Sequence, residues 1–159
     1  MKAAQNPILQ LHVSLDELHP VIWRRLLIDE SESLYELHYA IQGAFGWTNS
    51  HLHEFRIGSR SFQDAEMEGF EPDEAGNERD IPLKEAFKGK KATAHYLYDF
   101  GDDWGHTIVL ENRLPRQARV RYPKCIGGEF ACPPDDCGGA CGYADFVAAI
   151  TDPGNPEHE

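Results

Sequence analysis

Apolar and polar residues alternate over residues 8–15, which read ILQLHVSL. Side chains two residues apart point to the same face of a strand, so this pattern predicts a half-buried strand. Residues 16–20 turn the chain. Residues 21–28 are then expected to form a second, antiparallel strand with Trp23 in the core. Residues 52–57 predict a third strand.

Helical spacing appears in three later segments. Ser33 and Glu36 form a capping box, and apolar residues follow at helical intervals up to Gly46, which suits a helix C-terminus. His38 lies beside this apolar stripe, where we expect a structural hydrogen bond. A short helix is predicted over residues 81–87. Another is predicted over residues 143–150, with its Phe, Val and Ile side chains facing inward.

The most distinctive stretch is residues 95–111, HYLYDFGDDWGHTIVLE. Two alternating runs flank a Gly-Asp-Asp-Trp-Gly connector, which predicts a β-hairpin. We expect three cross-strand pairs, in which Phe100 faces His106, Tyr98 faces Ile108 and Tyr96 faces Leu110. This register turns Tyr96, Tyr98 and Phe100 into the protein as scaffolding, and a slip of one residue would exchange the two faces.

The element order β-β-α-β-(β)-α-β-β-α predicts an α+β fold. We expect a mostly antiparallel sheet of hairpins with helices packed on one face, formed by residues 1–159 as a single domain. Forty-one percent hydrophobic residues suit a globular protein. The chain has no signal-peptide pattern and no apolar run of spanning length, so we expect a cytoplasmic protein with no membrane partner.

Charge is distributed unevenly along the chain. The formal net charge of -12 argues against a nucleic-acid partner overall, because phosphate affinity depends on Lys and Arg. Residues 64–80 form a long acidic segment, for which we expect a mobile or disordered flap. Residues 113–124 instead carry five basic side chains and no acid. They are either a solvated loop, facing the acidic one, or a local site for phosphate or nucleic acid.

Four cysteines lie within seventeen residues: Cys125, Cys132, Cys137 and Cys141. A cytoplasmic disulfide is disfavoured, and no Cys-x-x-Cys pair is present. Zinc is the cofactor that such soft ligands would hold, with three thiolates and either the fourth thiol or a histidine. The alternative is free thiols in a turn-rich loop. In the same loop, residues 135–136 are two aspartates that we expect to cap a turn or to bond a basic residue.

Two further groups could carry chemistry. Asp99, Asp102, Asp103 and His106 surround the hairpin connector, where they could bind a metal or act as general acid and base. The alternative is an ordinary Asp-rich turn beside a buried histidine. His51 and His53 project to one face of a strand, as a two-histidine metal site requires, or they pack against neighbouring aromatic residues.

The sequence resembles one known family in four stretches. These are YDFGDDWGH at 98–106, PVIWRR at 20–25, the segment from LH at 37–38 through GW at 46–47 to HLHEF at 51–55, and CPPDDCGG at 132–139 with GY at 142–143. They are similar to the plasmid pRiA4b open-reading-frame-three-like family, some of whose members are named as resolvase-like TnpR passenger proteins of insertion elements.

The resemblance runs from about residue 8 to the end and implies no described biochemical activity. Cys125, Cys132 and Cys137 match positions where the family often has cysteine, whereas Cys141 stands where proline is commoner. Family members usually continue beyond this point, so the resemblance implies that the chain is truncated at its C-terminus. No serine nucleophile in a basic setting and no basic helix-turn-helix supports the resolvase-like name.

Two functions remain as hypotheses. The first is a small cytoplasmic binding or interaction module, associated with plasmids or mobile elements, whose partner is a protein or a small molecule. The alternative is a metal-dependent, hydrolase-like enzyme that uses the Asp and His cluster of the central hairpin. Phosphate-binding loops, a dinucleotide fingerprint and a Gly-x-Ser-x-Gly elbow are all absent from the sequence.

Overall fold

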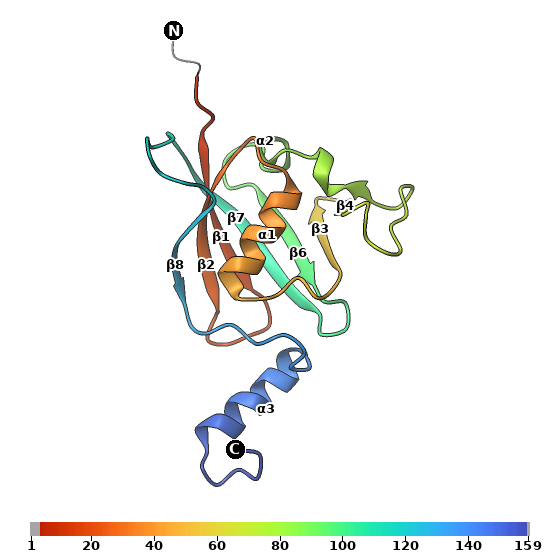
Figure 1. The fold of residues 1–159 in the computed structure, drawn as a ribbon, viewed down its shortest axis with the longest axis vertical. Coiled ribbons are helices and arrows are strands. Elements are labelled where there is room, and N and C mark those ends of the chain that lie inside the picture. The colour runs from red at the N-terminus through yellow and green to blue at the C-terminus, as the bar shows by residue number, and fades with distance from the viewer. Residues whose placement is uncertain (1–3, 159) are drawn as a thin grey trace.

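The computed structural model describes residues 4–158. Eight strands form one sheet in the order β5-β4-β3-β6-β7-β1-β2-β8 (Figure 1). Every neighbouring pair is antiparallel except β4 and β5. The helix α1 lies across one face of the sheet. The structure is therefore α+β with a mostly antiparallel sheet, which confirms the predicted fold class.

The centre of the sheet is built from the most regular strands. β1 (Ile8–Leu15) lies between β2 (Trp23–Asp29) and β7 (Trp104–Leu114). Side chains from one face of these strands pack against α1 (Leu34–Phe45), which ends at Gly46 in the left-handed conformation, as predicted. This layer contains the main hydrophobic core.

Trp23 is an exception to the predicted core. It is only half-buried and lies on the opposite face of the sheet. There its ring stacks on His12, with ring centroids 5.0 Å apart, and carries the guanidinium of Arg25. The prediction was wrong because side chains alternate along the strand. Leu26 and Ile28, both fully buried, face α1, and Trp23 lies an odd number of residues from each of them, on the other face.

The central hairpin joins β6 (Thr93–Tyr98) to β7, but its register differs from the prediction. Tyr96 pairs with His106, and Tyr98 pairs with Trp104. Both tyrosines are buried as predicted, whereas Phe100 lies in the connector and is 45% exposed. The tip is displaced because Asp99 and Asp103 both adopt left-handed backbone conformations, and the Asp103 N–H donates to the Asp99 carbonyl, which ends the pairing at Tyr98.

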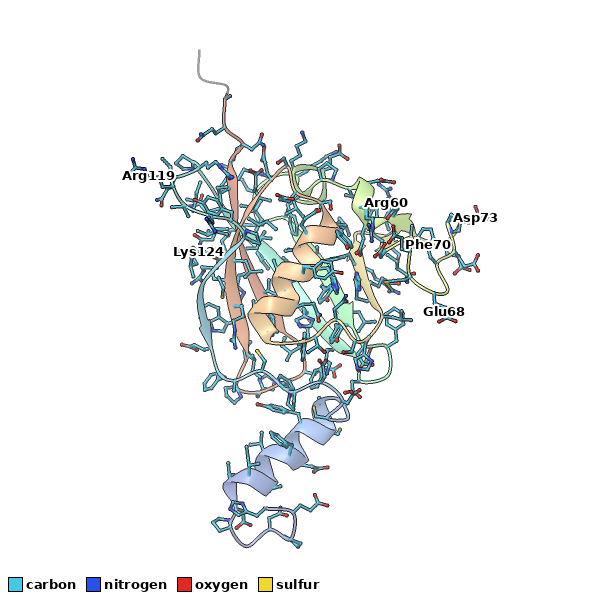
Figure 2. The ribbon with its side chains drawn as sticks, in the orientation of Figure 1. Arg60, Glu68, Phe70, Asp73, Arg119 and Lys124 are labelled. Atoms are coloured by element: carbon cyan, nitrogen blue, oxygen red, sulfur yellow. The ribbon has the colours of Figure 1, made fainter. Side chains whose placement is uncertain are left out.

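The acidic segment is more ordered than a mobile flap. After β3 (His53–Ile57) and β4 (Arg60–Gln63), it contains β5 (Gly76–Asn77) and the short 3-10 helix η1 (Glu78–Asp80). The helix α2 (Leu83–Ala86) follows, within the predicted range. Glu68 and Asp73 project away from the body (Figure 2), but Asp64 and Glu78 turn inward and are buried.

The C-terminal part differs most from expectation. Residues 114–142 include the edge strand β8 (Lys124–Glu129), which pairs with β2 and which the sequence did not predict. The helix α3 (Gly139–Thr151) begins four residues early and extends away from the sheet (Figure 1). Phe146 and Ile150 are about half exposed, so the prediction that they face inward was wrong. Within residues 4–158, no helix has both the length and the apolar character to cross a membrane.

Candidate functional site

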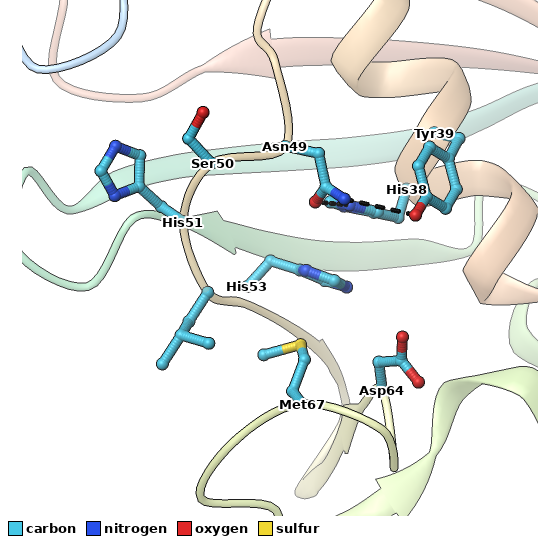
Figure 3. Close-up of a pocket in the computed structure, with 9 residues that line it drawn as sticks. His38, Tyr39, Asn49, Ser50, His51, His53, Asp64 and Met67 are labelled. Carbon is cyan, nitrogen blue, oxygen red and sulfur yellow. Dashed lines mark hydrogen bonds between the residues drawn. The ribbon is translucent and has the colours of Figure 1, made fainter.

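A polar pocket lies beside α1 near one end of the sheet (Figure 3). Its volume is about 350 Å³. The segment between α1 and β3 forms one wall, α1 forms the second, and the start of the acidic segment forms the third. The lining residues are His38, Tyr39, Asn49, Ser50, His51, Leu52, His53, Asp64 and Met67.

A buried histidine and glutamate pair stands behind this pocket. His53 begins β3 and is 3% exposed, and Glu78 begins η1 and is 0% exposed. The Nε2 atom of His53 lies 2.9 and 2.8 Å from the two carboxyl oxygens of Glu78. The other ring nitrogen, Nδ1, is buried and has no hydrogen-bond partner among the described residues. A buried polar atom without a partner is uncommon in proteins and calls for an explanation.

The protonation of this pair follows from its burial. Desolvation raises the pKa of Glu78 to about 8, and the nearby Asp64 charge adds to the effect. Desolvation lowers the pKa of His53 to about 4. At neutral pH the pair therefore holds one proton between Glu78 and Nε2. Wherever that proton sits, the imidazole must also carry a hydrogen on Nδ1. His53 thus offers its free Nδ1–H as a buried donor.

His38 supports the ring of His53 from α1. The two imidazoles stack with centroids 3.5 Å apart and planes 9° from parallel. His38 Nδ1 lies 2.7 Å from the Tyr96 hydroxyl, and Nε2 lies 2.7 Å from Asn49 Oδ1. Desolvation, followed by repulsion from His53, lowers the pKa of His38 to about 3, so the ring is neutral. The predicted structural hydrogen bond of His38 is confirmed.

The negative charge of Asp64, which lines the pocket, is compensated by an arginine. Asp64 receives two hydrogen bonds from Arg79, at 2.8 and 3.0 Å, and these bonds lower the pKa of the Asp64 carboxyl. The Arg79 guanidinium also lies over the ring of Tyr35, 4.0 Å from its centroid. The pocket therefore presents hydrogen-bonding groups with little net charge, beside the apolar side chains of Leu52 and Met67.

The predicted pair of His51 and His53 does not converge. His51 precedes β3, and in Figure 3 its ring projects in a different direction from that of His53. His51 Nε2 instead lies 2.9 Å from Asp136 Oδ1 and 3.5 Å from Asp99 Oδ2. Within residues 4–158, only this trio brings three potential metal-ligand atoms within 4.8 Å of one another.

The predicted cluster at the hairpin tip is also divided. Asp99 joins His51, as described above, whereas Asp102 Oδ2 accepts a hydrogen bond from the backbone of Gly138. His106 is fully buried and bonds the carbonyl of Tyr96, and desolvation lowers its pKa to about 4. Asp103 is exposed. The four residues therefore do not form one constellation, because the turn directs their side chains to different surroundings.

The structure does not bring the four thiols together as one ligand set. All four cysteines are free. Cys125 is exposed on β8, and Cys141 is exposed on α3. Cys132 Sγ lies 3.0 Å from Arg24 Nη2, and Cys137 Sγ contacts the Gly139 carbonyl. Cys125 and Cys141 lie on different elements, because β8 is at the sheet edge and α3 leaves the body. A cysteine zinc site therefore stays a prediction.

The basic segment lies far from the acidic one. Arg119 and Lys124 and the acidic Glu68 and Asp73 occupy opposite sides of the molecule (Figure 2). The prediction that the two loops face each other was wrong, because they flank opposite edges of the sheet. Two of the five basic side chains are already paired, Arg113 with Glu30 at 3.2 Å and Arg116 with Asp29 at 3.1 Å.

Sequence reasoning missed two residues of the candidate sites. Glu78 lies in the acidic segment that the sequence predicts to be a mobile or disordered flap. Asp136 is one of the two aspartates expected to cap a turn or to bond a basic residue. Neither residue carries a local signal for its distant partner, because 25 residues separate Glu78 from His53 and 85 separate Asp136 from His51.

Comparisons with known proteins support one family. A family model described as plasmid pRiA4b ORF-3-like protein matches residues 7–159. The chain is 37% identical over 153 residues to the uncharacterized protein y4hQ of Sinorhizobium fredii (strain NBRC 101917 / NGR234), covering 95% of this chain and 77% of the relative. It is also similar to the crystal structure of a protein of unknown function, MM3350, from Methanosarcina mazei Go1. That match has a TM-score of 0.86 and 31% identity, and it covers 98% of this chain and 87% of the other.

Proposed function

Since the chain belongs to the plasmid pRiA4b ORF-3-like family, whose matched relatives are uncharacterised, we propose its function from the pocket itself. We propose that the protein is a binding module that holds a small polar molecule against His53. The observation that carries this proposal is the buried Nδ1 of His53, which has no partner in the described part of the chain. A ligand oxygen would satisfy it.

The chemical character of the ligand follows from the lining. The Nδ1–H group requires an acceptor, such as a carbonyl or carboxylate oxygen. The pocket volume of about 350 Å³ suits a molecule of a few to a dozen heavy atoms. Leu52 and Met67 favour a ligand with an apolar portion beside its acceptor. A small amide or carboxylic acid meets these requirements.

The pair should also give binding a defined pH dependence. When Glu78 loses its proton above about pH 8, Nε2–H must donate to the carboxylate, and Nδ1 becomes an acceptor. A ligand acceptor then faces an acceptor on the protein. We therefore expect affinity to be constant from pH 6.5 to pH 7.5 and to fall as the pH rises through 8.

A titration tests this proposal with defined probes. Benzamide and benzoate would be added to the full chain while the nitrogen resonances of the histidine rings are recorded by NMR. We expect one of the two probes to shift the His53 resonances and to lose at least roughly tenfold in affinity in His53→Gln, because one buried hydrogen bond is removed. His95→Gln, on the exposed outer face of β6, is the matched control. Shifts confined to other histidines, or equal binding by His53→Gln, would contradict the proposal.

We also propose a cytoplasmic setting and an association with plasmids or mobile elements. Four unpaired cysteines suit a reducing compartment, and the plasmid in the family description suggests the genetic setting. Zinc bound by thiols belongs to the same set of proposals. Elemental analysis of the purified protein before and after Cys132→Ser tests the thiol site directly, because loss of zinc on that substitution would assign it.

A further inference from the structure

Three segments that are distant in sequence meet beside the pocket. His51 comes from the connection between α1 and β3, Asp99 opens the tip of the central hairpin, and Asp136 lies between β8 and α3. Their nearest ligand atoms all lie within 4.8 Å of one another. His51 also lines the pocket, so this group stands at the pocket's rim.

The carboxylate of Asp99 is only half satisfied. Its residue is 7% exposed. Oδ1 accepts the backbone N–H groups of Gly101 and Asp102, at 3.0 and 3.1 Å. Oδ2, which faces His51, accepts no hydrogen bond within residues 4–158. Oδ2 lies 3.5 Å from His51 Nε2, so its lone pairs point to the place where the three side chains converge.

The imidazole of His51 also has a ring nitrogen without a hydrogen-bond partner in the described chain. Its Nε2 atom is buried and has no hydrogen-bond partner in the described chain, although Asp136 Oδ1 lies only 2.9 Å away. The distance is short, but the contact does not have hydrogen-bond geometry. One ring nitrogen and two carboxylate oxygens that converge in this way form a ligand set of the kind that divalent ions bind.

A neighbouring acid is already engaged and does not belong to this group. Asp135 Oδ1 accepts from the Tyr98 hydroxyl at 3.1 Å, and Oδ2 accepts from the Thr48 backbone and hydroxyl. These bonds fix the loop that carries Asp136. The side chain of Asp136 is 73% exposed and free to adjust to a ligand.

We propose that His51, Asp99 and Asp136 bind one divalent cation of the zinc or manganese class. One imidazole with two carboxylates suits such borderline ions, whereas magnesium and calcium prefer oxygen ligands alone. Three protein ligands leave coordination positions for water or for a molecule in the pocket. This site does not depend on the ligand of His53, because none of its three ligands belongs to the His53 and Glu78 pair.

The test must separate this site from the cysteines. The full chain with all four cysteines changed to serine would be treated with a chelator and titrated with Mn²⁺ and Zn²⁺ by calorimetry. We expect one ion per chain. Asp136→Asn should weaken binding by at least roughly tenfold, and His51→Gln should do the same, because each removes a ligand. Asp103→Asn, an exposed acid of the same tip, should bind like the parent.

Two further measurements distinguish the loss of a metal ligand from unfolding of the variant. Bound Mn²⁺ is paramagnetic and should broaden the ring signals of His51 much more strongly than those of His12, on the other face of the sheet. Circular dichroism confirms that each variant is folded. The proposal is overturned if the parent binds neither ion at millimolar concentration, or if Asp136→Asn binds as tightly as the parent. Retained binding in His53→Gln would show that the cation site is independent of the pocket ligand.

Discussion

At the scale of single residues, burial decides the chemistry of this protein more than residue type does. Glu78 and Glu74 belong to the same acidic segment, but Glu74 is exposed and Glu78 has no exposed surface. The buried Glu78 has a raised pKa and a histidine partner. The acidic segment therefore contains one carboxyl group that is protonated at neutral pH and can donate a hydrogen bond.

Glu78→Ala should be strongly destabilising for that reason. The substitution removes the partner of His53 Nε2 and leaves a cavity under η1, so we expect the free energy of unfolding to fall by roughly 2–4 kcal/mol. Urea unfolding at pH 7 measures the difference. Glu74→Ala, in the exposed part of the same segment, should change stability by less than about 0.5 kcal/mol. Equal stability of the two variants would refute the assigned role of Glu78.

Stability should also depend on pH with a maximum near pH 6.5. Folding holds an extra proton on Glu78 between its ordinary pKa of 4.5 and about 8, so stability rises as the pH falls from 8 to 6.5. Below pH 6.5 the unfolded chain protonates His38, His53 and His106, whose folded pKa values are about 3, 4 and 4. Together, these three protonations of the unfolded chain destabilise the folded state more than the extra proton on Glu78 stabilises it. Stability therefore falls below pH 6.5.

The expected loss between pH 6.5 and pH 5 is on the order of 3 kcal/mol. Urea unfolding at half-unit intervals from pH 5 to pH 9 measures the curve. Glu78→Gln cannot titrate at this position and should remove the decline between pH 6.5 and pH 8 while leaving the acid decline in place. A wild-type curve that is flat, or that rises steadily as the pH falls below 6.5, would show that the three histidines are not buried as neutral groups.

At the scale of elements, turns and helix ends explain which predictions succeeded. The capping box at Ser33 and Glu36 and the stop at Gly46 are local features, and α1 begins and ends where they indicate. The hairpin was predicted with its faces correct, because Tyr96 and Tyr98 are buried. Its tip was misplaced by two residues, because the sequence does not reveal that Asp99 and Asp103 would adopt left-handed conformations.

The edge strand β8 and the exposed face of α3 could not be predicted from the sequence, for a different reason. β8 contains Gly127 and Gly128, and its side chains are mostly exposed, so no alternating pattern marks it as a strand. Gly128 is needed there because a β-carbon would collide with the backbone and side chain of neighbouring β2 residues. α3 has apolar residues at helical spacing, but spacing alone cannot show whether a helix packs on the sheet or leaves it.

Two glycines inside helices give a matched prediction at this scale. A β-carbon at Gly142 would collide with the carbonyl oxygen of Cys137, whereas one at Gly43 in α1 meets nothing within 4 Å. Gly142→Ala should therefore displace the first turn of α3 and reduce its hydrogen-exchange protection, leaving the sheet unaffected. Gly43→Ala should stabilise the protein by roughly 0.5–1 kcal/mol through helix propensity. Unchanged protection of α3 in Gly142→Ala would contradict the observed packing.

At the scale of the whole molecule, both candidate sites lie where distant segments meet at one end of the sheet. His53 and Glu78 join β3 to the acidic segment, and His51, Asp99 and Asp136 join three separate connections. The sequence could nominate His51, His53 and Asp99 as chemically capable residues. It could not group them, because the groupings depend on strand order and on contacts between residues far apart in the chain.

The sheet depends little on α3 for its stability. The helix extends from the body, and its contacts with the core are made chiefly by Ala140 and Tyr143 near its first turn. Deletion of residues 139–159 should therefore leave cooperative unfolding intact and lower the free energy of unfolding by less than about 2 kcal/mol.

Urea unfolding followed by tryptophan fluorescence measures this change, because Trp47 and Trp104 are both buried in the body. The full chain with Phe146→Ser is the control for effects of exposed apolar surface alone, since that side chain is 43% exposed and should contribute little to folding. Loss of the cooperative transition after deletion would mean that α3 completes the core. The half-exposed Phe146 and Ile150 would then have to pack on the sheet in solution, contrary to their position here.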